Sequence, residues 1–397
     1  MTEPAGRAAS LAGALDRITV ADLRRRRGLK WTYAGPDVLG AFVAEMDFGT
    51  APAVEAALCD VIGRRDFGYL TPAAVQEMAE SVAAWLARRY GWAVDPARIR
   101  PLPDVIKGLE AAITIFSRPG RPVILPTPAY MPFLTVPPRL GRRIIQVPMI
   151  TDGGRLALDL DGIAAAFRAG GHLLILCNPC NPAGRVYTPA ELAAVSEVVA
   201  RHGGRVFADE IHAPLVYPGH RHTPYAASSA TAAGNSITSI SASKGWNLPG
   251  LKCAQLILTS DADAETWAAA GGLAEHGAST PGVRANTAAF AAGGEWLAGV
   301  LGYLDGNRML LADLIAEHLP GVGYRPPEGT YLAWLDCRGL GLGDSPGEFF
   351  LDKARVLVND GPAFGEAGKG HVRLNFATPR PILARIVRQL GQAAASR

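Results

Sequence analysis

Residues 239–252 read SISASKGWNLPGLK, and the lysine in this stretch, Lys244, is the most informative residue of the chain. Lys244 follows a run that is typical of a strand, residues 236–240, and a turn rich in glycine and proline comes after it. Its small neighbours leave room for a cofactor, and two hydroxyls and a second cation, Lys252, lie within reach of a phosphate. Most lysines are solvated surface groups, because burying an ammonium costs free energy. The rest of the chain must therefore decide whether Lys244 is an amine that forms a Schiff base.

The composition is that of an ordinary globular protein with room for two domains. The chain has 397 residues, of which 49% are hydrophobic and 19% are charged. A net charge of +3 is too small to indicate a nucleic-acid or membrane partner. Residues 24–27 are four arginines, which form either a nucleic-acid patch or the solvated face of a short N-terminal helix. The sequence has no other basic cluster, and this favours the helix.

The cysteines and histidines show no pattern of a metal site. An odd count of scattered cysteines indicates a reducing compartment without a disulfide framework: Cys59, Cys177, Cys180, Cys253 and Cys337. Cys177 and Cys180 form a CxxC, but a zinc or redox site would need a second pair or a thioredoxin-like context. His220 and His222 form an HxH without partners in the sequence, which indicates a surface loop.

No targeting or membrane segment is expected. The first thirty residues carry arginines and lack the apolar stretch of a signal peptide. The longest uncharged stretch, residues 223–243, is too polar to span a membrane. The sequence therefore predicts a cytoplasmic protein.

Short apolar runs alternate with helical patterns over the first two thirds of the chain. This alternation predicts an α/β domain with a mostly parallel sheet, in which ligands bind at the carboxyl ends of the strands. Strands are predicted at 121–125, 143–147, 172–177, 205–208, 236–240 and 255–259, and helices at 52–58, 73–90, 105–116, 160–169 and 189–202.

The pattern changes at about residue 285. A long, nearly continuous helical stretch is predicted over 288–319 and ends at Pro320. It is followed by a strand at 331–335, a helix at 346–353 and a strand at 372–376. We expect a smaller α+β domain over 288–397, which the N-terminal arm (1–48) joins, and a large domain over 49–287.

Three more clusters carry chemistry besides the lysine. Residues 178–184, NPCNPAG, are either a plain turn or part of a site. Asp209 ends a buried run at 206–208, and a carboxylate there is costly unless a cation offsets it. Arg373 stands inside an apolar strand, where a guanidinium favours a bidentate anion such as a substrate carboxylate. Together the clusters supply the groups that pyridoxal 5'-phosphate needs: an amine, a carboxylate, phosphate ligands and a carboxylate clamp.

In order and spacing these clusters resemble the fold-type I pyridoxal-phosphate enzymes of the aminotransferase class I/II superfamily. More narrowly, the chain resembles the MalY/PatB group of cystathionine β-lyase-like C–S lyases, from about residue 30 to its end. Glu45 stands where that group more often has aspartate. The narrower match rests on Lys30-Trp31, 44–48 (AEMDF), 67–69 (FGY), 303–308 (YLDGNR) and 329–335 (GTYLAWL).

The resemblance implies a role for each residue of the cofactor ring site. Lys244 would form the Schiff base, and Asp209 would keep the pyridine nitrogen protonated. Asn181 and His212 would contact the phenolate oxygen, and Tyr130 would stack on the ring. Two of these have structural alternatives: Tyr130 as a plain core aromatic and His212 as a turn cap.

The resemblance also implies a phosphate site. The phosphate would rest on the helix start at Val105 and Ile106, where free N–H groups favour an anion. Ser241 and Lys252 would complete this site. Lys252 replaces an arginine that is frequent in the superfamily, which keeps the charge but loses the fork of donors.

A homodimer and an amino-acid substrate are implied as well. Tyr69 would reach across from the neighbouring subunit, and Arg373, with Asn181, would bind the substrate carboxylate. Three further aromatic residues fit the core as well as the site: Trp246, Trp334 and Tyr331.

The implied reaction is β-elimination from cystathionine or another cysteine S-conjugate. Lys244 would remove the Cα proton, a thiolate would leave from Cβ, and pyruvate and ammonia would follow. The same early steps serve an aminotransferase that acts with a 2-oxo acid, and the sequence does not decide between the two. A non-catalytic regulatory protein that binds pyridoxal phosphate is a third hypothesis, which the intact set of Lys244, Asp209 and Arg373 disfavours.

Overall fold

The computed structural model describes residues 11–396. Within this range the chain divides into two compact units. The large unit comprises Thr50–Cys180 and Arg185–Leu297, and the small unit comprises residues 11–49, Asn181–Gly184 and residues 298–396. The short segment Asn181–Gly184 thus belongs to the small unit, although the chain on either side of it belongs to the large one.

A seven-stranded sheet forms the centre of the large unit, in the order β2-β10-β9-β8-β7-β3-β4. Only β10 runs antiparallel to its neighbours, and the other adjacent pairs are parallel. The predicted α/β class with a mostly parallel sheet is therefore confirmed. The strands are β2 Ile99–Leu102, β3 Val123–Thr127, β4 Ile144–Pro148, β7 Leu173–Cys177, β8 Arg205–Asp209, β9 Ser236–Ile240 and β10 Ala254–Leu258.

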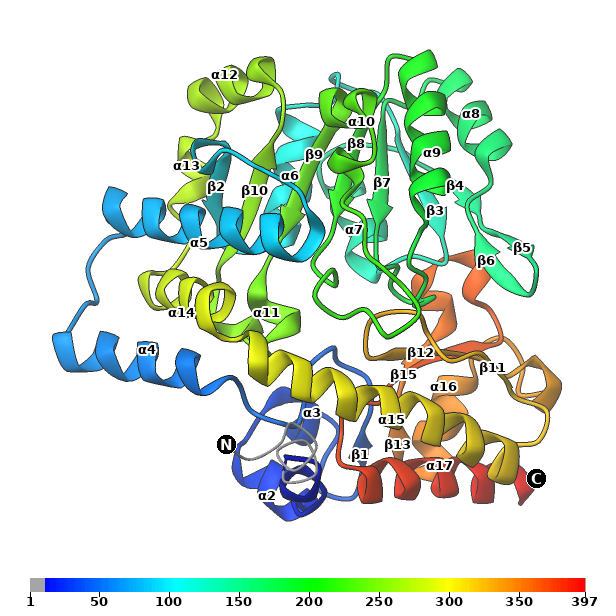
Figure 1. The fold of residues 1–397 in the computed structure, drawn as a ribbon. Helices are drawn as coiled ribbons and strands as arrows, with labels where there is room; N and C mark the ends of the chain where they lie inside the picture. Colours follow the sequence, from blue (N-terminus) through cyan, green and yellow to red (C-terminus); the bar gives the residue numbers. More distant parts are fainter. Residues whose placement is uncertain (1–10, 397) are drawn as a thin grey trace. The chain divides into compact units, whose positions relative to one another are not determined.

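Helices cover both faces of this sheet (Figure 1). Side chains alternate between the faces, and Ile175 and its neighbour Leu176 in β7 are both buried, as expected for a strand covered on both sides. Helices α6 and α7 lie on one face, and α5, α8 and α9 lie on the other. The helices of the unit are α4 Pro52–Arg64, α5 Pro72–Tyr90, α6 Val105–Thr114, α7 Met131–Arg139, α8 Leu160–Arg168, α9 Pro189–Arg201, α10 Ala230–Asn235, α11 Ala242–Gly245, α12 Asp261–Ala270, α13 Gly272–Glu275 and α14 Thr280–Ala292.

The small unit contains a four-stranded antiparallel sheet in the order β11-β12-β15-β14. A second, two-stranded parallel sheet pairs β1 with β13. The elements are α2 Val20–Arg25, α3 Leu29–Thr32, β1 Leu39–Gly40, β11 Gly323–Tyr324, β12 Leu332–Asp336, α16 Pro346–Phe349, β13 Val356–Leu357, β14 Asn359–Asp360, β15 His371–Asn375 and α17 Arg380–Ala395, together with α15, Gly294–His318, from residue 298 onward.

The predicted, nearly continuous helical stretch over 288–319 consists of two helices separated by Gly293. Helix α14 ends at Ala292 and α15 begins at Gly294. The indole of Trp246 packs against this junction and donates a hydrogen bond to the Gly293 carbonyl at 2.9 Å. A Cβ at position 293 would lie 2.3 Å from Trp246 Nε1, so only glycine fits there.

Two elements were missed. Strand β2 contains Pro101, which argues against a central strand, but β2 lies at the edge of the sheet, where proline is tolerated. Helix α17 is amphipathic, and its apolar side chains are buried in the small unit.

Two of the four arginines of residues 24–27, Arg24 and Arg25, belong to a short helix, α2, as predicted. Thr19 caps α2, and its hydroxyl and the carboxylate of Asp22 form a reciprocal capping box. Arg26 donates to the Asp47 carbonyl at 2.7 Å, so part of the run binds backbone oxygen within the small unit. In the described part of the chain no helix is both long and apolar enough to cross a membrane. All five cysteines are free thiols.

Candidate active site

Lys244 lies in α11, the short helix that follows β9. The extended backbone at Ser241 ends the strand, and its hydroxyl accepts a hydrogen bond from the Ser243 N–H at 3.0 Å. The same hydroxyl donates to the Cys253 carbonyl at 2.7 Å. Asn286 accepts from the Ala242 N–H at 3.0 Å. These bonds fix the backbone that carries the lysine, directly after the predicted strand.

Asp209 is the last residue of β8, the parallel neighbour of β9. In register it pairs with Ser239 on one side and with Cys177 of β7 on the other. The side chain is buried and accepts a hydrogen bond from the Ile211 N–H at 3.1 Å. Burial above all, and the nearby charge of Glu210, raise the pKa of the Asp209 carboxyl from 3.8 to about 7, against the lowering effects of the Ile211 hydrogen bond and of the Lys244 charge. A carboxylate in this setting favours an added cation, and a protonated pyridine nitrogen would fit that requirement.

The predicted phosphate site begins at α6, a ten-residue helix whose first turn includes Val105 and Ile106. The N–H groups of a first turn have no acceptor within their own helix and attract anions. Asp104 caps this helix through a 2.9 Å hydrogen bond from the Lys107 N–H, and its second oxygen lies 3.0 Å from Nζ of Lys252. The structure therefore places Lys252 at the start of α6, where it pairs with the capping carboxylate.

Tyr130 and His212 occupy turns after two strands of the sheet. Tyr130 is the N-cap residue of α7, is half-buried, and meets the Phe133 ring edge-on at 5.5 Å between centroids. His212 is buried in the turn after β8, and its carbonyl accepts from the Leu215 N–H at 2.8 Å. Both positions follow carboxyl ends of strands, but their predicted contacts with a cofactor ring stay predictions.

Arg373 and Asn181 are brought together within the small unit. Arg373 Nη1 donates to the Asn181 amide oxygen at 3.0 Å, and Nη2 donates to the Phe42 carbonyl at 2.7 Å and to the side chain of Asn359. The guanidinium is buried and lies 5.1 Å from the centre of the Phe364 ring. These acceptors are neutral oxygens, so they orient the guanidinium without cancelling its charge.

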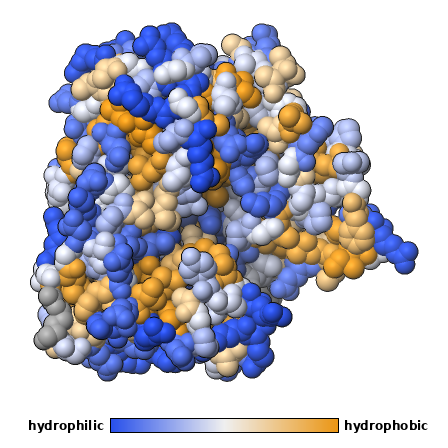
Figure 2. Space-filling model, turned by 180° about the vertical axis from the view of Figure 1, so that it is seen from behind, coloured by the Kyte–Doolittle hydropathy of each residue, from blue (hydrophilic) through white to orange (hydrophobic). Residues whose placement is uncertain are grey.

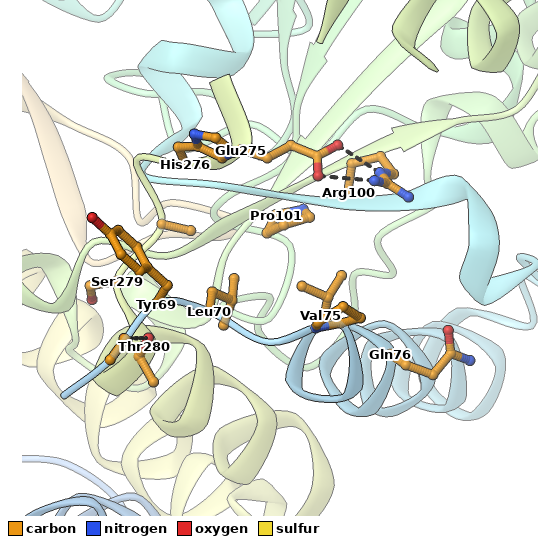
Figure 3. Close-up of a pocket in the computed structure, with 13 residues that line it drawn as sticks. Tyr69, Leu70, Val75, Gln76, Arg100, Pro101, Glu275, His276, Ser279 and Thr280 are labelled. Atoms are coloured by element: carbon orange, nitrogen blue, oxygen red, sulfur yellow. Dashed lines mark hydrogen bonds and ion pairs between the residues drawn. The ribbon is translucent and has the colours of Figure 1, made fainter. Parts of the chain in front are cut away.

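Tyr69 is fully exposed in the single chain. It lines a hollow of about 810 Å³ in the large unit, together with residues of α5, β2 and the segment 275–280. Figure 3 shows Tyr69 beside Ser279 and Thr280 at one end of the hollow, and Val75 and Gln76 at the other. The backbone N–H of Ser279 donates to the Lys252 carbonyl at 3.0 Å, so the hollow borders the segment that carries the predicted phosphate ligand.

Much of the sequence that carried the narrower resemblance has a structural role. Lys30 and Trp31 both bind the buried carboxylate of Asp47, at 2.9 and 2.8 Å. Asn307 donates to the backbone carbonyls of residues 376 and 378. Tyr331 is buried and donates to the Ala44 carbonyl at 2.9 Å.

The predicted surface loop at His220 and His222 was wrong for His222. Its side chain is buried, and its Nε2 lies 3.1 Å from a carboxylate oxygen of Glu210. Neither Glu210 nor His222 was predicted as a site residue. The signal was the second carboxylate directly after Asp209, because a buried glutamate requires a partner of its own.

Trp246 and Trp334, which the sequence left open as core or site residues, pack against other rings, and within the described residues the possible metal ligands do not cluster. Trp246 is fully buried against Trp85 and Phe290 and is therefore a core residue. Trp334 is half-buried and stacks on His371. Among residues 11–396, no group of three or more His, Cys, Asp or Glu could hold a metal ion.

The sheet, the lysine that follows β9 and the buried aspartate that ends β8 define the class of fold-type I enzymes. Comparison with known proteins narrows this class. The sequence pattern of "Aminotransferase class I and II" matches residues 38–390, and the chain belongs to this family.

The chain is also similar in sequence to individual named proteins and in structure to a solved protein. The chain is 42% identical to a putative cystathionine beta-lyase of Mycobacterium tuberculosis, over 96% of this chain and 98% of the relative. It is 33% identical to the cystathionine beta-lyase PatB of Bacillus subtilis, over 88% and 92%. The crystal structure of a putative pyridoxal-phosphate-dependent beta-cystathionase from Corynebacterium diphtheriae matches with a TM-score of 0.90 and 40% identity, over 95% of this chain and 98% of that one. The predicted fold type and the resemblance to the MalY/PatB group are confirmed.

Proposed function

We propose that this chain is a pyridoxal-phosphate-dependent carbon–sulfur lyase. It would act on cystathionine or another cysteine S-conjugate and release a thiol, pyruvate and ammonia. The observation that carries the proposal is the buried Asp209 at the end of β8, next to the parallel strand β9 that leads into Lys244 of α11. The names of the relatives at 33–42% identity support the lyase activity.

The proposed chemistry divides between the cofactor and the chain. Pyridoxal phosphate, when bound, supplies an electron sink for the substrate Cα. Lys244 would hold the cofactor covalently and, as a free amine, would move the Cα proton as a base. Asp209 would face the ring nitrogen and favour a proton there. Asn181 and His212 would bind the phenolate oxygen, and Tyr130 would cover the ring face.

The phosphate is assigned to the start of α6. The backbone N–H groups of Val105 and Ile106 would donate to it, with Ser241 and Lys252 beside them. Because Lys252 already pairs with Asp104 at 3.0 Å, a bound phosphate would compete with this carboxylate for the ammonium. The Lys252 ammonium has three donors and could bind both groups, whereas the Ser241 hydroxyl would have to turn its single proton from the Cys253 carbonyl to the phosphate.

The substrate carboxylate is assigned to Arg373. The hydrogen bonds of this guanidinium to Asn181 and to the carbonyl of Phe42 hold its plane in place, and a fixed fork suits a carboxylate. Orientation before binding lowers the entropy cost of positioning the substrate.

A homodimer is the proposed assembly, with Tyr69 contributed across the interface. Large apolar side chains are exposed on the large unit, and exposed apolar surface of this kind marks interaction sites: Ile62, Phe67, Tyr69 and Leu273. Figure 2 shows apolar atoms on the projecting region at its right side, where the corner between α4 and α5 lies after the rotation from Figure 1. Sedimentation of the purified protein would test the dimer. A cytoplasmic location and the two predicted domain boundaries stay predictions.

A product assay separates the lyase from its alternatives. The purified protein is incubated with cystathionine, cystine or S-alkyl cysteines, with and without a 2-oxo acid, and pyruvate, ammonia and thiol are measured. We expect pyruvate and thiol in equal amounts without a 2-oxo acid. Turnover only in the presence of a 2-oxo acid would favour an aminotransferase, and cofactor binding without any turnover would favour a regulatory protein.

A further inference from the structure

A second buried carboxylate, Glu210, lies directly beside Asp209. Its side chain and that of His222 are each about 1% exposed, and their Oε2 and Nε2 atoms are 3.1 Å apart. The other carboxylate oxygen accepts a hydrogen bond from the Tyr225 N–H at 2.6 Å. Such a group is strongly disfavoured inside a protein unless it is bound in this way. The reaction proposed above gives Glu210 no task.

The hydrogen bonds of Asn178 decide the protonation of His222. The Tyr187 N–H donates to Oδ1 of Asn178 at 3.0 Å, which fixes the orientation of this amide. The Asn178 NH2 group then faces the Thr223 carbonyl at 3.3 Å and Nδ1 of His222 at 3.5 Å. An amide NH2 only donates, so Nδ1 of His222 accepts and its proton sits on Nε2. His222 is therefore neutral and donates to Glu210.

A neutral His222 leaves the charge of Glu210 uncancelled within the cluster. This charge is tied to the strand ends that carry the site: the Glu210 N–H donates to the Ser239 carbonyl at 2.9 Å, and the Asn178 N–H donates to the Asp209 carbonyl at 2.9 Å. After burial, the charge of Glu210 is a further cause of the raised pKa of Asp209. The carboxylate thus acts on the acid that faces the ring nitrogen.

The other titratable groups around the cluster set the balance of charge. The Tyr90 ring meets the His222 ring edge-on at 5.0 Å, and burial raises the pKa of the Tyr90 hydroxyl above its usual value, so this phenol is neutral near pH 7. The charge of Arg89 acts on Tyr90. Lys244 is the cation that acts on Asp209 in opposition to Glu210.

We propose that Glu210, held by His222 and Asn178, is a positioning residue that keeps a proton on the pair formed by Asp209 and the cofactor's ring nitrogen. This inference rests on the proposed binding of pyridoxal phosphate. The negative charge of Glu210 raises the proton affinity of both members of this pair, so the pair keeps its proton to a higher pH. Glu210 acts through Asp209, and its loss changes the protonation of the bound cofactor.

Two variants of Glu210 separate charge from shape. Glu210→Gln removes the charge and keeps an oxygen for the Tyr225 N–H, whereas Glu210→Asp keeps the charge and shortens the side chain. The measurement is a pH titration of the absorbance of the bound cofactor in the holoenzyme. We expect the midpoint to fall by about one pH unit in Glu210→Gln and by less in Glu210→Asp. Equal midpoints in the wild type and Glu210→Gln, or an equal fall in both variants, would overturn the inference.

A measurement on the unaltered protein covers the case in which a variant does not fold. Nitrogen-15 NMR of the histidine rings in the holoenzyme reports where His222 carries its proton. We expect a neutral ring with the proton on Nε2 at pH 7. A doubly protonated ring, or a proton on Nδ1, would contradict the charge assignment. A wild-type protein without any cofactor absorbance would contradict the proposed function instead, so the two failures are distinguishable.

Discussion

The substitution Asp209→Asn is expected to raise the unfolding free energy of the protein without its cofactor. It should lower the unfolding free energy of the protein with the cofactor bound. Burial raises the pKa of this carboxyl from 3.8 to about 7, a difference of roughly 3 pH units or roughly 4 kcal/mol. The folded state therefore holds the proton more tightly than the unfolded state does. The stability that this provides is full below pH 3.8 and is lost as the pH rises through about 7.

The size of the effect depends on pH in a calculable way. Asparagine has almost the shape of aspartate and carries no charge, so its burial lacks the free-energy cost of burying an ionised carboxylate. The cofactor-free Asp209→Asn protein should exceed the wild type by roughly 4 kcal/mol in unfolding free energy at pH 8, and by roughly 2 kcal/mol at pH 5. With pyridoxal phosphate bound, the ring cation offsets the charge of Asp209, and the order of stabilities should reverse.

Urea unfolding measures this prediction directly. Both proteins are compared at pH 5 and pH 8, with and without saturating pyridoxal phosphate, at one protein concentration. An advantage of the variant that is the same at both pH values would refute the raised pKa. A variant that stays more stable than the wild type with cofactor present would refute the pairing of Asp209 with the ring.

Three further predictions concern single side chains. Arg373→Lys keeps the charge but loses the fork, and should lower kcat/KM by roughly 30-fold, or about 2 kcal/mol, in steady-state kinetics, whereas the exposed Arg338→Lys should leave it unchanged. Lys30→Met leaves the Asp47 carboxylate buried without its ion pair and should lower the urea midpoint by an amount equivalent to about 3 kcal/mol; an unchanged midpoint would contradict the importance of this pair. Gly293→Ala places a methyl group against a buried indole and should cost about 2 kcal/mol by the same measurement, and a neutral result would show that the helix break has another cause.

The sequence predicted those parts of the fold that depend on local patterns. Strand β9 was predicted with its observed bounds, Ser236–Ile240. A short run of apolar and hydroxyl residues that is bounded by turn residues is typical of a strand. The clusters at Asp209 and Arg373 were found in the same way, since a charged residue inside an apolar run is conspicuous.

The features that the sequence missed depend on contacts between distant residues. The burial of His222 depends on Glu210, twelve positions earlier, and on an amide from another strand end. The break at Gly293 depends on Trp246, which is 47 positions away. Neither residue shows its partner in the sequence around it.

The central claim is that Lys244 holds pyridoxal phosphate covalently. Reduction of the purified protein with borohydride would convert such a bond to a stable secondary amine, and peptide mass spectrometry would locate it. We expect the pyridoxyl group on Lys244 in the wild type and none in Lys244→Ala. A pyridoxyl group on any other lysine, or none in a protein supplied with the cofactor, would contradict the account.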